Sequence, residues 1–109
     1  MEKQSFESAK VYNLKKTISI AEGGVVSKQF IKSNGGNITI FAFDKGQGLS
    51  EHTAPFDAIV QIIEGKAEVS IEGKKFKVHE GEMINMPANI PHALHAVEAF
   101  KMCLIMLKG

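Results

Sequence analysis

The chain has 109 residues, 44% hydrophobic and 23% charged, which is enough apolar material to bury a core without disulfides. Its 13 basic and 12 acidic residues give a net charge of +1, which argues against a nucleic-acid partner. The single cysteine, Cys103, excludes an internal disulfide, and no apolar run is long enough to span a membrane. No signal peptide is recognisable, so we expect a single-domain cytoplasmic protein with no membrane partner.

The N-terminal part of the chain changes character along its length. Residues 1–9 are polar apart from Phe6, and we expect them to form either a frayed end or a short helix. Apolar and polar residues alternate over residues 17–20, which predicts a half-buried strand. Two glycines, Gly23 and Gly24, end that pattern, and a second strand is predicted to begin at Val25.

The middle of the chain reads as a series of strands. Residues 37–44 are apolar at both alternating positions, which indicates a strand covered on both faces. Residues 58–78 are predicted to form three strands joined by two tight hairpins, at residues 64–66 and 72–74. Each of these turns contains a glycine, which adopts the positive φ of a sharp reversal at low cost.

Two further strands are predicted in the C-terminal part. One follows Gly81 and ends at Pro87, which has no N–H to donate to a neighbouring strand. The last covers residues 100–107 and is apolar on both faces. No stretch keeps a helical period for more than a turn or two, so the sequence predicts an all-β sandwich or barrel.

Two stretches carry glycines, a proline and histidines at fixed spacings. Residues 46–65 resemble the first cupin motif, G-x5-H-x-H-x3-E-x6-G, with matches at Gly46, His52 and Gly65. Residues 81–96 resemble the second, G-x5-P-x-G-x2-H-x3-N, with matches at Gly81, Pro87 and His92. The resemblance covers about residues 35–107 and implies a single cupin domain, a β-barrel of the jelly-roll type.

The sequence departs from the cupin motifs at four positions: Ala54 for a histidine, Ala58 for a glutamate, Asn89 for a glycine and Ala96 for an asparagine. The resemblance implies four metal ligands, of which only His52 and His92 remain. Two imidazoles alone hold a metal weakly, since catalytic sites commonly use three protein ligands. Candidates for a third donor are Asp57, Glu51, His95, Met83 and Met86.

Small residues at the two lost ligand positions are expected to enlarge the pocket and make it apolar, and methionines of the last strand could add to its wall. The predicted pocket residues are His52, Ala54, Ala58, Val60, Ile62, Met86 and His92. If the two imidazoles face each other, both cannot easily be protonated, so the pKa of one should fall below about 6.5. The same two residues are the catalytic candidates.

Three functions remain open from the sequence. The first is binding of a small organic molecule, with a degenerate metal site or no metal at all, either as a binding module or as a small enzyme that acts without metal. The second is a metal-dependent dioxygenase or isomerase, in which His52, His92 and a non-standard donor would hold Fe, Mn, Ni, Zn or Cu. The third is a ligand-sensing or regulatory subunit, because single-domain cupins resemble the sensing domains of some transcription regulators.

The strand that contains Val60 and Ile62 should present Ile59, Gln61 and Ile63 on its opposite face. An outward apolar row on a small barrel needs cover, and a second copy of the chain is the simplest cover. The sequence therefore predicts a homodimer, with cover by the N-terminal strands as the alternative.

Overall fold

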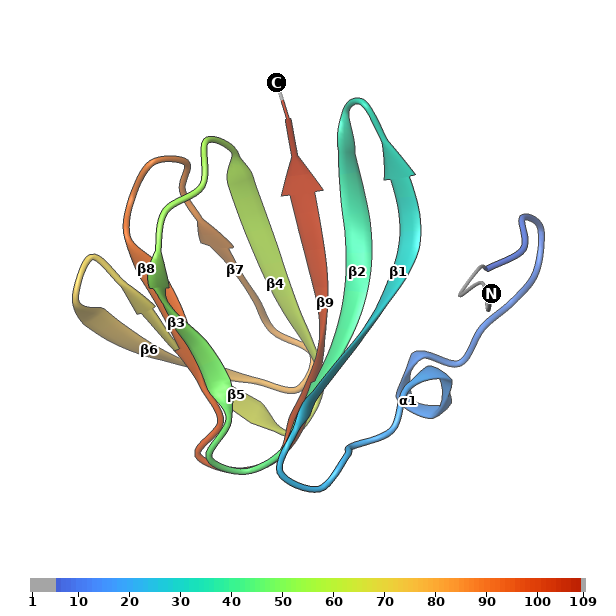
Figure 1. Cartoon of the computed structure of the whole chain (residues 1–109), viewed down its shortest axis with the longest axis horizontal. Coiled ribbons are helices and arrows are strands. Elements are labelled where there is room, and N and C mark those ends of the chain that lie inside the picture. The colour runs from blue at the N-terminus through green and yellow to red at the C-terminus, as the bar shows by residue number, and fades with distance from the viewer. Residues whose placement is uncertain (1–5, 109) are drawn as a thin grey trace.

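The computed structural model describes residues 6–108, which form two antiparallel β-sheets facing each other (Figure 1). One sheet has five strands in the order β1-β2-β9-β4-β7, and the other has four in the order β3-β8-β5-β6. The strands are β1 (Val25–Ser33), β2 (Gly36–Phe43), β3 (Gly48–His52), β4 (Asp57–Glu64), β5 (Lys66–Ile71), β6 (Lys74–His79), β7 (Met83–Met86), β8 (His92–His95) and β9 (Phe100–Leu107). This architecture confirms the predicted all-β jelly-roll barrel.

The main core lies between the two sheets. The ribbons converge at one end of the barrel and splay apart at the other, where β9 ends (Figure 1). The rings of Phe43 and Phe100 stack with centroids 4.6 Å apart and are fully buried. Apolar side chains from both sheets pack around this pair, including Val60, Ile62 and Val69. Burial of this apolar surface is the main force that holds the two sheets together.

Strand β2 has a core on each side, as its sequence pattern predicts. Phe41 and Phe43 contact the core between the sheets, while Ile40 and Ala42 belong to a second buried cluster on the outer face of the five-stranded sheet. The alternation arises because successive side chains of a strand point to opposite faces.

The N-terminal segment supplies the cover for part of that outer face. The prediction of a strand at residues 17–20 is wrong. A single-turn helix, α1 (Leu14–Thr17), is followed by irregular chain. Ile18 of this chain is only 1% exposed and belongs to the outer cluster. Two lysines anchor the segment, because Lys28 Nζ donates to Thr17 O at 2.9 Å and Lys101 Nζ donates to Lys15 O at 2.6 Å. Apolar and polar residues also alternate where every second side chain of an irregular segment packs on a sheet, even though the segment pairs with no strand.

Residues 6–9 form no helix, and residues 1–5 lie outside the described part of the chain. Within residues 6–108 no helix is long and apolar enough to cross a membrane.

The turn at Gly65 is not the hairpin that the sequence predicted. Strands β4 and β5 lie in different sheets, so the chain crosses from one sheet to the other at this residue. Gly65 has φ +79°, and a Cβ there would lie 2.6 Å from the carbonyl oxygen of Ala99. Only glycine allows both the left-handed backbone and this close approach.

The turn at Gly73 is the hairpin that was predicted. Strands β5 and β6 pair directly, and Ile71 lies opposite Lys74. Glu72 and Gly73 both have positive φ, at 52° and 83°, as expected for a two-residue turn that matches the twist of its strands.

Candidate functional site

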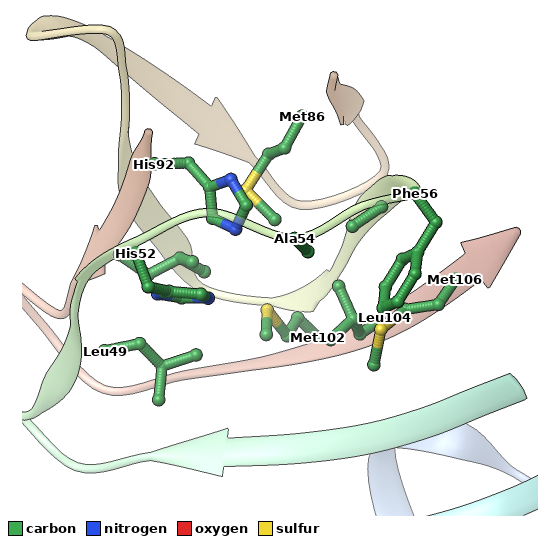
Figure 2. A pocket seen from close by; sticks show the side chains of 11 residues that line it. Leu49, His52, Ala54, Phe56, Met86, His92, Met102, Leu104 and Met106 are labelled. Atoms are coloured by element: carbon green, nitrogen blue, oxygen red, sulfur yellow. The ribbon is translucent and has the colours of Figure 1, made fainter. Parts of the chain in front are cut away.

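A pocket of about 210 Å³ lies between the two sheets (Figure 2). Its wall is formed by β3, β4, β7, β8, β9 and the loop between β3 and β4. The lining residues are Leu49, His52, Ala54, Phe56, Ala58, Met86, His92, Leu94, Met102, Leu104 and Met106. Apart from two imidazole rings, every one of these side chains is apolar.

The two histidines meet because their strands pair. His52 lies opposite His92 in the β3–β8 ladder, and the ring centroids are 4.4 Å apart with an angle of 72° between the ring planes. Figure 2 shows both rings pointing into the pocket. His92 is 3% exposed, whereas His52 is exposed at the mouth.

A β-bulge in β3 aims His52 into the pocket. Leu49 pairs with Leu94 and His52 pairs with His92, so three steps along β3 match two steps along β8. Without the extra residue, Leu49 and His52 would point to opposite faces of the sheet. The bulge therefore lets both side chains line the pocket.

Backbone carbonyls fix the proton on each imidazole. His52 Nδ1 lies 2.7 Å from Ser50 O, and His92 Nδ1 lies 3.1 Å from Ile90 O. A carbonyl oxygen can only accept a hydrogen bond, so each Nδ1 carries the proton in the neutral ring. Each Nε2, the ring nitrogen further from the backbone, is left as an acceptor at the pocket.

The surroundings lower the pKa of His92. Burial is the main cause, because it disfavours the charged imidazolium, and the nearby His52 adds a smaller effect in the same direction. The hydrogen bond to Ile90 O opposes both. Burial, rather than the pairing of imidazoles expected from the sequence, is the larger cause of the lowered pKa of His92.

The structure places five of the seven predicted pocket residues in the wall of this pocket: His52, Ala54, Ala58, Met86 and His92. Met102 and Met106 of β9 join them, which the sequence suggested only as a possibility for the last strand. Leu49, Phe56, Leu94 and Leu104 were not foreseen, since their positions depend on strand pairing and on the path of the β3–β4 loop.

The other two predicted residues, Val60 and Ile62, do not line the pocket. Both point into the barrel from β4 and are buried, at 0% and 1% exposed. They pack in the core cluster with Phe43 and Phe100, whose stacked rings occupy this part of the interior. Alternation along a strand predicts on which face of the sheet a side chain lies. It does not predict how far a pocket extends along that face.

The donors present do not fit a divalent metal. Within residues 6–108 there is no group of three or more histidine, cysteine, aspartate or glutamate side chains that could hold one. Asp57 is exposed, and its Oδ1 accepts a hydrogen bond from the N–H of Ala88 at 2.9 Å. Met86 offers a thioether, a donor that suits Cu(I) rather than harder ions.

Three of the other candidate donors lie away from the pocket wall. Glu51 and His95 are exposed, and Met83 is 59% exposed. None of the three is among the lining residues. Neighbours of pocket residues along a strand point to the opposite face, which accounts for Glu51 beside His52.

Asn89, at the glycine position of the second motif, has a left-handed backbone conformation. It has φ +64°, a left-handed conformation that asparagine tolerates better than most residues. In this conformation its N–H donates to Ala54 O at 2.7 Å. The bond ties the β7–β8 loop to the β3–β4 loop beside the pocket.

The fold and the site together define a small β-barrel protein with an apolar, histidine-bearing pocket between its sheets. The sequence profile of the cupin domain matches residues 39–107, more than half of the chain. The chain therefore belongs to the cupin family, as its two motifs predicted.

Solved structures give the same assignment. A conserved protein of unknown function from Streptococcus pyogenes is 42% identical, with a TM-score of 0.90, over 95% of this chain and 91% of that one. A cupin 2 conserved barrel domain protein from Leptotrichia buccalis is 41% identical, with a TM-score of 0.86, over 89% of this chain and 47% of that one. A cupin superfamily protein from Desulfitobacterium hafniense shares the fold, with a TM-score of 0.86 at 24% identity over 98% and 97% of the two chains. Comparison with proteins of curated function gives no match.

Proposed function

We propose that this cupin binds a small, largely apolar organic molecule in the pocket, with His52 and His92 as its polar contacts and without a metal. The observation that carries the proposal is the composition of the wall, in which nine of the 11 lining side chains are apolar and the other two are imidazoles. Apolar pockets with a few placed polar groups are the usual form of small-molecule sites.

The size of the pocket supports a ligand of about one ring. Its volume of 210 Å³ exceeds the roughly 150 Å³ of an engineered apolar cavity that binds benzene. Three methionines in the wall, Met86, Met102 and Met106, add flexible and polarizable surface that can adapt to a ligand.

Binding alone would suit a ligand-sensing or regulatory subunit in the cytoplasm. A metal-free reaction would use His92 or His52 as a general base, because neutral imidazoles can accept a proton near neutral pH. A metal-dependent dioxygenase or isomerase is less favoured, because the positions of the missing ligands carry Ala54 and Ala58 and the nearby Asp57 is turned to Ala88.

Binding of p-xylene, measured by calorimetry and by chemical-shift changes in NMR spectra, tests the proposal. We expect saturable binding to the wild-type protein, with shifts at Ala58, Met86 and Leu94. Ala54→Leu should weaken binding at least tenfold by filling the pocket, and the exposed Ala21→Leu should not. Equal binding by both variants would contradict the proposal.

We also propose that the chain forms a homodimer through the outer face of its five-stranded sheet. The N-terminal segment covers Ile40, Ala42 and Ile63 there. Ile59 and Ile105, which pair across β4 and β9, are half-buried and lie outside that cluster. An apolar strip of this kind is typical of a protein interface.

A further inference from the structure

We infer that the ligand carries a hydroxyl group and no negative charge, so that its class is a neutral phenol or a cyclic alcohol of similar size. This inference rests on the proposed function and adds to it the chemistry of the group that meets the two histidines. It follows from the hydrogen-bond acceptors that the pocket offers and from the free hydrogen-bond donors and positive charges that it lacks.

The pocket offers two hydrogen-bond acceptors. The Nδ1 atoms of His52 and His92 are engaged by Ser50 O and Ile90 O, so both Nε2 lone pairs remain available at the pocket. The ring centroids are only 4.4 Å apart, so the two acceptors lie at the same end of the pocket and face the same end of the ligand. A ligand hydroxyl donates to an unprotonated Nε2, whereas a methyl group in the same place leaves it without a partner.

The pocket lacks what an anion needs. Its lining contains no lysine, arginine or hydroxyl side chain, and the Nδ1–H donors of the two neutral imidazoles are already engaged by backbone carbonyls. A carboxylate entering it would lose its hydration and gain neither a counter-charge nor a hydrogen bond. Many organic acids are thereby disfavoured at pH values where both rings are neutral.

The apolar wall determines the shape and polarity of the part of the ligand beyond its hydroxyl group. Figure 2 shows Phe56, Leu104 and Met106 at the end of the pocket away from the two imidazoles. A molecule that fills the site would therefore place its hydroxyl at the histidines and its hydrocarbon body toward these three side chains. A phenol with a para methyl group has this shape.

Three probes of nearly equal shape separate the possibilities at pH 8: p-cresol, p-xylene and p-toluate. We measure their affinities by calorimetry for the wild-type protein and for His52→Leu and His92→Leu. Because one hydroxyl proton can be accepted by either Nε2, the ratio of p-cresol to p-xylene affinity should fall about three- to tenfold in the double variant His52→Leu, His92→Leu, measured as well, and by less in each single variant, as the loss of one neutral hydrogen bond predicts. His95→Leu is the matched control, because His95 is an exposed histidine of the same strand β8, and it should leave the ratio unchanged.

The outcomes are distinguishable. If both neutral probes bind but the ratio is the same in all variants, or if p-toluate binds most tightly, the inference is overturned, whereas binding of a small organic molecule in this pocket still stands. If no probe binds to the wild-type protein, both are overturned. Because His92 is buried and its replacement can prevent folding, the wild-type protein decides the result in that case: p-cresol should bind more tightly than 4-methylanisole, whose oxygen has no proton to donate, and equal binding overturns the inference.

Discussion

At the scale of single residues, two backbone carbonyls determine the chemistry of the site. Ser50 O and Ile90 O hold the protons of His52 and His92 on Nδ1 and leave both Nε2 atoms as acceptors. Burial then keeps His92 neutral to lower pH, because it lowers the pKa of this imidazole. His92 is therefore set up to receive a donor near neutral pH.

The lowered pKa of His92 predicts how stability depends on pH. The unfolded chain has the ordinary value of 6.5, so it binds the proton first as pH falls. The contribution of neutral His92 to the free energy of unfolding is complete above about pH 6.5. It is lost as pH falls through the lower pKa that His92 has in the folded state. Urea unfolding between pH 7.5 and 5.0 should show a smaller loss of stability for His92→Leu than for the wild type.

His95→Leu is the control for that experiment, because His95 is exposed on the same strand. It should keep the wild-type dependence on pH. If His92→Leu has the same dependence as well, the buried imidazole is not the cause.

At the scale of elements, Gly65 lets the chain pass from one sheet to the other. Gly65→Ala should lower the free energy of unfolding by roughly 2–5 kcal/mol, because a left-handed alanine costs about 1–2 kcal/mol and overpacking about 1–3 kcal/mol more. Gly73→Ala is the matched control: its φ is +83°, but a Cβ there meets nothing within 4 Å. It should cost only about 1–2 kcal/mol. Equal losses in urea unfolding would show that the close approach to Ala99 is unimportant.

Much of the fold was predictable from local patterns. Strands β1, β2, β4, β5, β6, β7 and β9 were foreseen because apolar alternation and glycine turns are local signals. The short strands β3 and β8 were not foreseen, because His52 and His92 lie in polar stretches close to prolines, and these stretches extend by pairing with each other and, for β8, with β5. The crossing at Gly65 looked like a hairpin because a glycine turn does not reveal which strands pair on either side of it.

The candidate site was predictable in part, through the spacing of its motifs. The cupin resemblance brought His52, Ala54, Ala58 and His92 together, and the structure places all four in the pocket wall. Neither the bulge that aims His52 nor the engagement of Asp57 with Ala88 has a local sequence signal. Both depend on contacts between segments that are distant in the chain.

At the scale of the whole molecule, one strip of the outer face is apolar and only half-buried. A homodimer that buries Ile59 and Ile105 should sediment at twice the mass of the chain at micromolar concentration. Ile105→Glu should shift it toward the monomer, because two copies would bring like charges into an apolar interface. Lys75→Glu, an exposed change on β6 in the other sheet, should leave the dimer intact. A wild-type protein that sediments as a monomer would contradict the proposed dimer.

The barrel as a whole presents a pocket lined by apolar side chains and two imidazoles, which we propose binds an organic ligand and no divalent metal. The most direct test is the metal content of the untagged protein expressed with Mn, Fe, Co, Ni, Cu and Zn each available, beside a His52→Ala, His92→Ala double variant. Our account predicts no more metal in the wild type than in the variant. One metal per chain that disappears in the variant would contradict it and would show that an unforeseen third donor completes a metal site.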